Sequence, residues 1–155
     1  MSYGVRRQPY IPGPLDTYQK LQDYLNSCPP DLTELNLRGK QIKSLTRIHF
    51  PPGLKRLYLT DNDITSLSPS YNPYEPRPST PLNVVFPPGL ESLDLRKNKI
   101  RNLEGVVFPP SLKFLDLEEN QIKSLKGVVF PSGLEGLHLY SNQINSLAGV
   151  MFPVG

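Results

Sequence analysis

Tryptophan is absent from the sequence, and its 155 residues include one cysteine, Cys28, and two histidines. A single cysteine excludes an internal disulfide framework, and no Asn-x-Ser/Thr sequon occurs, so we expect an intracellular, cytoplasmic protein. The sequence also lacks a run of about 18 apolar residues and an apolar signal-peptide stretch near the N-terminus. We therefore expect a soluble, unprocessed chain with no membrane span.

Catalytic motifs are missing as well. Beyond carboxylates and amines, the candidate nucleophiles and bases are Cys28, His49 and His138, and they form no convergent set. The sequence has no Gly-x-x-x-x-Gly-Lys, His-Glu-x-x-His, paired Cys-x-x-Cys or Gly-x-Ser-x-Gly motif. We predict that the protein is not an enzyme and that it carries no cofactor and no metal site.

Proline content and charge set further limits. Proline usually makes up only ~5% of a protein, and the 18 prolines of this chain exceed that share by enough to exclude a helix bundle. Hydrophobic residues make up 37% of the chain, which suffices for a core. The formal charge of +3 is a mild imbalance, so nucleic-acid binding is the least favoured class of function. The affinity of such binding would depend steeply on salt concentration. Such binding would use Arg6, Arg7, Arg38, Arg56 and Arg96.

A repeat runs through most of the chain. The motif Phe-Pro-Pro/Ser-x-Leu recurs with its phenylalanine at positions 50, 86, 108, 130 and 152. From Phe86 to Phe152 successive phenylalanines of the motif are 22 residues apart. The spacing from Phe50 to Phe86 is longer because this unit contains an insertion. Cys28 occupies the same position one period before Phe50. About five repeat units are predicted.

Within each unit a Leu-x-Leu pair predicts a short strand, because side chains alternate between the two faces of a strand. The pairs lie at 35/37, 57/59, 93/95, 115/117 and 137/139, and the strands should stack in parallel. An inward asparagine after each of the last four pairs can bond the polar backbone groups of the turn in a ladder. These residues are Asn62, Asn98, Asn120 and Asn142. Lys40 replaces asparagine in the first unit, so the ladder should end there, with the lysine stem reaching outward.

The pattern Leu-x-x-Leu-x-Leu-x-x-Asn-x-Ile-x-x-Leu, as in residues 112–125, resembles the leucine-rich repeat family. The 22-residue length with Asn-x-Ile resembles its phosphatase-regulating subfamily, and the Pro-Pro-x-Leu element resembles repeats of bacterial effectors and of large DNA viruses. The resemblance implies an α/β leucine-rich-repeat solenoid with a short parallel sheet on its concave face. Because proline follows each phenylalanine, we expect an irregular or 3-10 convex side.

Two segments precede the repeats. Residues 1–14 are predicted to form an extended arm that is either a free tail or a tether to a neighbouring protein, with Arg6, Arg7 and Tyr10 as candidate contacts. Residues 15–27 are predicted to form a helix that caps the N-terminal end of the solenoid, which then occupies residues 28–155. A capping box of Asp16 and Gln19 is expected at the start of this helix.

The insertion loop at residues 68–81 contains five prolines and two tyrosines. It is either a tolerated loop or a contact loop that docks on another subunit through Tyr71 and Tyr74. No capping segment follows the last unit, so its open edge is expected to be covered by a partner or by self-association.

The residues that flank the inward leucines form the expected binding face. Three outward aromatics, Tyr58, Phe114 and Tyr140, are the preferred contact candidates, with packing between neighbouring strands as the alternative. The charged candidates are Arg38, Arg56, Arg96, Asp94, Asp116 and His138. Asp94, Asp116 and His138 fall in adjacent rows, but a flat exposed sheet offers no pocket, so they predict no metal site.

A repeat surface without a reaction centre indicates a binding module. We predict a non-enzymatic protein-interaction module, a scaffold or adaptor, that binds protein partners through its strand face, its arm and its insertion. The alternative is a structural subunit built permanently into a large assembly, such as a minor capsid or cement component of a large DNA virus particle. In that alternative the protein would be part of a virion.

Overall fold

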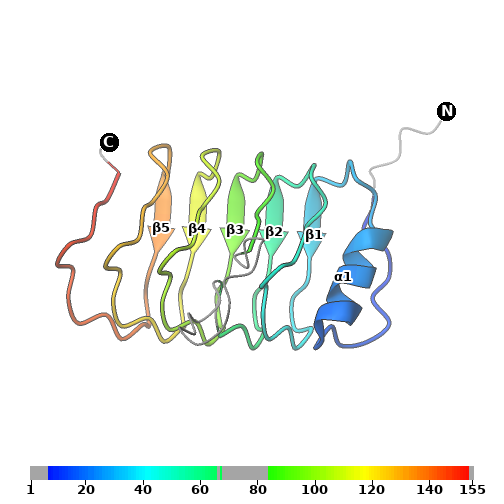
Figure 1. The fold of residues 1–155 in the computed structure, drawn as a ribbon, viewed down its shortest axis with the longest axis horizontal. Helices are drawn as coiled ribbons and strands as arrows, with labels where there is room; N and C mark the ends of the chain where they lie inside the picture. The colour runs from blue at the N-terminus through cyan, green and yellow to red at the C-terminus, as the bar shows by residue number, and fades with distance from the viewer. Residues whose placement is uncertain (1–6, 66, 68–83, 154–155) are drawn as a thin grey trace, which may run out of the picture.

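The computed structural model describes residues 7–65, 67 and 84–153, and within them the chain forms one helix followed by five short strands (Figure 1). The helix α1 spans Tyr18–Ser27, and the strands are β1 (Glu34–Asn36), β2 (Arg56–Tyr58), β3 (Ser92–Asp94), β4 (Phe114–Asp116) and β5 (Gly136–His138). Each strand pairs in parallel with its neighbours in the sequence, in the order β1-β2-β3-β4-β5. The chain is therefore a solenoid that completes four turns from β1 to β5.

The strands stack in register, so that one leucine column runs through all of them. Leu35 pairs with Leu57, Leu57 with Leu93, Leu93 with Leu115, and Leu115 with Leu137. The first four of these leucines are at most 1% exposed. Because side chains alternate along a strand, the residues on either side of each leucine point to the opposite face of the sheet.

Buried asparagines join successive repeats at the turn after each strand. The amide nitrogen of Asn120 donates to the carbonyls of Leu95, Leu117 and Glu118, at 3.0, 3.1 and 3.2 Å. Its Oδ1 accepts the N–H of Ile100 at 3.1 Å. One side chain thus satisfies polar groups from two repeats, which ties the turn of one repeat to the turn of the next.

The same pattern is made by the other three asparagines of the repeat. They are Asn62, Asn98 and Asn142. In the first unit, the N–H of Lys40 donates to Oδ1 of Asn62 at 2.9 Å. The turn that has a lysine in place of asparagine is therefore completed by the asparagine of the following repeat.

A second stack runs along the return side of the solenoid, where neighbouring phenylalanine rings lie 6.3, 6.2, 6.4 and 6.0 Å apart between centroids and almost parallel. The rings are those of Phe50, Phe86, Phe108, Phe130 and Phe152. The described return segments are irregular and contain no 3-10 helix, as the first of the two predicted alternatives requires. Each short hydrogen bond there, such as Leu112 N–H to Pro109 carbonyl at 3.0 Å, closes a single turn, and the prolines prevent its extension.

Every repeat also makes one tight turn on its return side, closed by a backbone hydrogen bond to a leucine carbonyl. Val106 N–H donates to the Leu103 carbonyl at 3.1 Å across two intervening residues. In the unit with the insertion, Val84 N–H donates to the Leu67 carbonyl at 3.2 Å, although the whole segment 68–83 lies between them in the sequence. The predicted insertion loop, 68–81, lies outside the described residues, but its flanks close the turn of an ordinary repeat.

The helix α1 begins at Tyr18, three residues after the predicted start. The predicted capping box of Asp16 and Gln19 is wrong. The N-cap residue is Thr17, whose Oγ1 accepts the N–H of Lys20 at 3.2 Å. Threonine is a favoured N-cap residue because its hydroxyl satisfies an N–H that has no partner within the helix.

The late start of α1 has its cause in the first repeat. Leu15 N–H donates to the Lys40 carbonyl at 2.8 Å, which holds the chain extended against the solenoid before the helix begins. From there α1 lies beside β1 (Figure 1) and buries Leu21 and Leu25 to 1% and 3% exposure. The predicted helical cap at the N-terminal end is thus present.

Two glutamine side chains cover backbone edges at this end. Oε1 of Gln8 accepts the N–H of Asn36 at 2.6 Å, and its Nε2 donates to the Asn36 carbonyl at 2.8 Å. Gln22 of α1 makes the same pair of bonds with His49, at 2.9 and 3.0 Å. An amide presents an acceptor and a donor side by side, as the backbone of a neighbouring strand does, so it can pair an open sheet edge.

The described part of the arm is bound to the solenoid itself. The Tyr24 hydroxyl donates to the Pro9 carbonyl at 2.7 Å, and Ile11 packs against the core. Burial, followed by the nearby Cys28, raises the pKa of Tyr24 to about 12, so its hydroxyl remains a hydrogen-bond donor. Residues 7–14 are therefore held in place by this chain, an arrangement that neither the free-tail nor the tether hypothesis anticipated.

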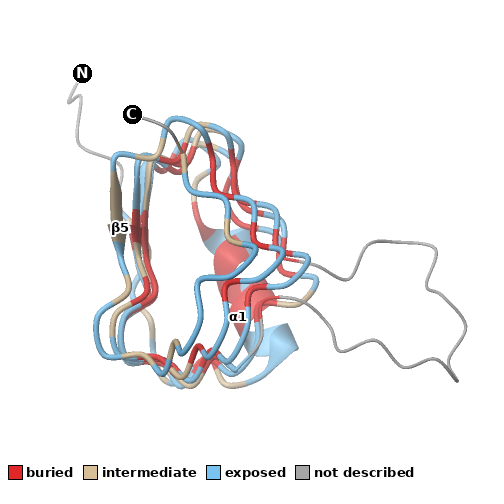
Figure 2. Cartoon of the chain, turned by 90° about the vertical axis from the view of Figure 1, so that its left-hand side faces the viewer, coloured by how far each residue is buried: buried red, intermediate tan, exposed pale blue. Residues whose placement is uncertain are grey.

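The last repeat is far more exposed than the others, as the view onto its side shows (Figure 2). Leu125 is 0% exposed, whereas Leu147, at the same position one repeat later, is 58% exposed. Phe130 is 6% exposed, whereas Phe152, at the same position one repeat later, is 46% exposed. Within the described chain no further layer covers this side, so side chains of the core type lie at the surface.

Candidate partner-binding face

The strand face comprises the outward side chains of β1 to β5 and of the residue two positions beyond each strand. The inward leucines alternate with these residues, so the repeat itself fixes their direction. From the N-terminal to the C-terminal repeat, the strand face consists of Glu34, Asn36, Arg38, Arg56, Tyr58, Thr60, Ser92, Asp94, Arg96, Phe114, Asp116, Glu118, Gly136, His138 and Tyr140. Its first two rows carry two arginines and one glutamate, and its last three rows carry three carboxylates and one arginine.

Weak contacts hold the arginine side chains of the first two rows. Arg56 Nη1 lies 4.0 Å from Glu34 Oε2, and both side chains are more than half exposed, so solvent screens the pair. Arg38 is exposed and lines a hollow of about 690 Å3 together with Tyr10 and Gln8 of the arm. Two predicted contact residues from distant parts of the sequence, Tyr10 and Arg38, are thus brought together at this end of the face.

A bidentate ion pair anchors the middle of the strand face. Nη2 of Arg96 lies 2.8 Å from Oδ2 of Asp94, and Nε donates at 3.1 Å to both carboxylate oxygens. Burial alone would raise the pKa of Asp94, but the hydrogen bonds and charge of Arg96, with the Thr60 hydroxyl, lower it overall. Asp94 is 8% exposed, so this carboxylate is a structural partner of Arg96 rather than a free contact residue.

Three further groups meet beside that pair. Nδ1 of His138 lies 3.7 Å from Oδ2 of Asp116 and 3.5 Å from Oε1 of Glu118. Arg96 reaches Asp116 only at 3.4 Å, through the same Nε that donates to Asp94. Burial, then the negative charges of Glu118 and Asp94, raise the pKa of Asp116. This corner of the face therefore holds more negative charge than its one arginine neutralises.

The aromatic side chains differ in exposure. Phe114 is 50% and Tyr140 77% exposed, whereas Tyr58 is half-buried, and burial followed by the charge of Glu34 raises the Tyr58 pKa. Phe114 lies over Gly136, where an added Cβ would come within 3.0 Å of the ring. Because Gly136 has no side chain, the Phe114 ring can lean across β5 and form one wall of a depression of about 150 Å3.

The other predicted contact residues are dispersed. Arg6, Tyr71 and Tyr74 lie outside the described residues, and Arg7 is exposed on the arm. Sequence reasoning missed Glu118 as a site residue, although it stands in the same outward column as Tyr140, and that column was the available signal. The edge-covering role of Gln8 carries no sequence signal, because it depends on how the arm folds back.

Asp116, Glu118 and His138 each offer a ligand atom within 4.8 Å of the other two, which is the spacing of a metal-binding group. The set differs from the one considered from the sequence, since Asp94 is engaged by Arg96 and Glu118 takes its place. The three side chains are 23%, 30% and 60% exposed, and the Arg96 guanidinium adjoins Asp116. These features favour charge pairing with solvent access over an enclosed metal site.

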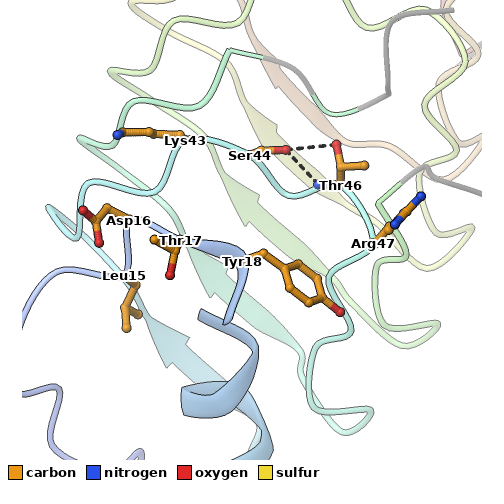
Figure 3. A pocket seen from close by; sticks show the side chains of 8 residues that line it. All are labelled: Leu15, Asp16, Thr17, Tyr18, Lys43, Ser44, Thr46 and Arg47. Carbon is orange, nitrogen blue, oxygen red and sulfur yellow. Dashed lines mark hydrogen bonds between the residues drawn. The ribbon is translucent and has the colours of Figure 1, made fainter. Parts of the chain in front are cut away.

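Another hollow, of about 370 Å3, lies where α1 meets the first repeat (Figure 3). Asp16, Thr17 and Tyr18 line it from the start of the helix, and Lys43 and Arg47 line it from the first repeat. Its charges are of both signs, and Lys20 already pairs with Asp16 at 3.0 Å. The arrangement explains how the cap joins the first repeat and points to no particular ligand.

A solenoid of parallel strands with buried leucine columns and an asparagine ladder defines a class of repeat proteins that bind through extended surfaces. The family model for leucine rich repeats matches residues 88–132 of this chain. The protein thus has a leucine-rich-repeat fold, as its sequence resemblance implied. Such domains generally serve as protein-interaction modules.

The chain is also similar to a solved structure described as that of a Shigella effector LRR domain. The two are 29% identical with a TM-score of 0.58, and the match covers 78% of this chain and 45% of the other. This chain therefore spans less than half of that protein's solved length. None of the curated proteins compared with the chain matches it. The helix α1 is too short and too polar to cross a bilayer, and it is the only helix among the described residues.

Proposed function

We propose that the protein is a non-enzymatic interaction module that binds protein partners through its strand face. The observation that carries the proposal is the exposure of Phe114 and Tyr140, at 50% and 77%, on a face where most other side chains are charged or polar. Exposed aromatics next to arginine and carboxylate groups are typical of binding hot spots. The general role of leucine-rich repeats supports the same function.

A second candidate is a structural subunit of a large assembly, and a different surface favours it. On the return side, apolar residues at one repeat position are exposed in four successive repeats, by 52%, 74%, 73% and 77%. They are Val85, Val107, Val129 and Met151. A contiguous exposed apolar stripe is a feature of permanent contacts. Under this candidate the return side is buried, and a virus particle is one such assembly.

The finer family placement is also a proposal. We infer that the repeats are of the bacterial-effector kind, because of the 29% identity with the Shigella effector domain and the Pro-Pro-x-Leu element of the sequence. An intracellular site of action is supported by Cys28, a buried free thiol whose pKa is raised by burial. No step of the binding proposal depends on either point.

A photo-crosslinking amino acid placed at single positions tests the two candidates against each other. Phe114 reports on the strand face and Val107 on the return side, and both side chains are at least half exposed. In cells of the source organism, the proposal expects discrete crosslinked protein adducts from position 114 and few from position 107. Adducts confined to position 107 would favour the assembly subunit, and no adducts from either position would overturn both.

A further inference from the structure

The acidic end of the strand face is underneutralised. Asp94, Asp116 and Glu118 bring three carboxylates together, with Arg96 as the one guanidinium among them. That guanidinium directs two nitrogens at Asp94, which also accepts the Arg96 backbone N–H at 3.0 Å. With the histidine neutral, the group carries a formal charge of −2, concentrated on Asp116 and Glu118. A cation placed near these two carboxylates would therefore be attracted by negative charge that Arg96 does not neutralise.

The geometry leaves room for such a cation. His138 is at 3.5 and 3.7 Å from the two carboxylates, beyond ordinary hydrogen-bond length, so it does not saturate either of them. The titratable and charged groups that face this position are Asp94, Asp116, Glu118, Arg96 and His138. Burial first, and then the negative charges of Glu118 and Asp94, raise the pKa of Asp116.

Exposed aromatic residues lie in the same row of the strand face as the carboxylates and in the next row. Phe114 lies on the same face of β4 as Asp116, and its ring leans over Gly136 at the side of the shallow depression. Tyr140 is in the row next to Glu118, since the neighbouring Glu119 N–H donates to the Tyr140 carbonyl at 2.9 Å. Long cationic side chains bury their methylene stems against apolar surfaces and place their charge over aromatic rings.

We propose that Phe114, Asp116, Glu118 and Tyr140 form a subsite for a lysine or arginine side chain of a protein partner. The inference rests on the proposed function and adds the chemistry of the partner. The two carboxylates pair with the cation, and the two rings hold the stem that carries it. Phosphate-bearing ligands are repelled from this subsite, because its charge has the same sign as theirs.

The test selects random dodecapeptides displayed on phage against the immobilised full chain at pH 8 and low salt. The subsite variant is Asp116→Asn with Glu118→Gln, which keeps the size and hydrogen-bonding capacity of both side chains. The matched control is Asp23→Asn with Asp61→Asn, because both carboxylates are exposed, lie outside the strand face and carry the same total charge. Selected peptides are synthesised, and their affinities for all three proteins are measured by fluorescence anisotropy.

The proposal expects selected peptides to share a lysine or arginine whose replacement by norleucine weakens binding about tenfold. The subsite variant should lose a similar factor, and the control less than about twofold. Two results would overturn the inference: enriched peptides in which no lysine or arginine is needed for binding, or peptides that bind the subsite variant as tightly as they bind the parent protein. Either result would leave the strand face as a binding face. If no peptide depends on Phe114 or Tyr140, as shown by Phe114→Ala with Tyr140→Ala, the proposed function fails at this face together with the inference.

Discussion

The two ends of the solenoid use the same repeat and reach different degrees of burial. At the N-terminal end, α1 and the arm cover the first unit, and Leu45 is 0% exposed. At the other end, Leu147 occupies the equivalent position and is 58% exposed. The leucine of a repeat is therefore buried by its neighbouring layers, and the consensus pattern alone does not determine its contribution to stability.

The largest effect is expected for a pair of leucine truncations that isolates this difference. Leu125→Ala should lower the free energy of unfolding by about 2–5 kcal/mol, because it opens a cavity in a fully buried column. Leu147→Ala should cost less than about 1 kcal/mol, because that side chain is already in contact with water. Urea denaturation of both variants measures the pair, and equal losses would mean that the last repeat is as well packed as the fourth.

The asparagine ladder should give the next largest effect. Asn120→Ala removes four hydrogen bonds and leaves buried carbonyls without a partner, at a cost of about 1–3 kcal/mol. The matched control is Asn102→Ala, since Asn102 is exposed and its side chain accepts a single local N–H from Glu104. Thermal unfolding should separate the two variants clearly, and an unchanged melting temperature for Asn120→Ala would contradict a stabilising ladder.

The glutamine contacts at the N-terminal end should give smaller, local effects. Gln22→Ala should lower the free energy of unfolding by about 1–2 kcal/mol and speed hydrogen exchange at the His49 amide. Gln8→Ala should lower it by about 1 kcal/mol and speed hydrogen exchange at the Asn36 amide. Gln19→Ala serves as the control, because that side chain bonds only to Asp23 on the same helix. Identical exchange rates in the parent and the Gln8 variant would show that the arm does not cover the edge of β1.

The smallest effect distinguishes two carboxylates on the strand face. The lowered pKa of Asp94 means that its ionised form stabilises the fold above the unfolded pKa, and that this stability is lost as pH falls through the folded pKa. Asp94→Asn should therefore cost about 1 kcal/mol at pH 7 and little in strong acid.

For Asp116 the sign is opposite, because its folded pKa is raised. Its ionised form opposes folding at neutral pH, and that penalty disappears as pH falls below the folded pKa toward the unfolded value. Asp116→Asn should leave stability at pH 7 within about 0.5 kcal/mol of the parent, or slightly above it. A loss equal to that of Asp94→Asn would show that Asp116 is also satisfied by Arg96.

The repeat made much of the fold predictable. Its constant period determines the strand positions, the inward leucines and the asparagine turns, because each depends only on side-chain alternation and on backbone groups that must be bonded. The start of α1 was not predictable from capping preferences, since the Leu15 bond to Lys40 is a tertiary contact. The pairing of Asp94 with Arg96 was likewise not predictable from the sequence. Both residues are outward by pattern, but which carboxylate receives the guanidinium depends on side-chain geometry.

The hydrogen bond from Val84 to Leu67 joins the two flanks of residues 68–83 as the same bond does in an uninterrupted repeat. A neighbouring repeat closes this turn around two residues, and here the same turn closes around the whole segment 68–83. For a flexible loop, each doubling of length costs only about 0.6 kcal/mol in closure entropy. This position is therefore a natural graft point, where a foreign peptide with adjacent ends could be displayed from a repeat scaffold while the strand face remains free.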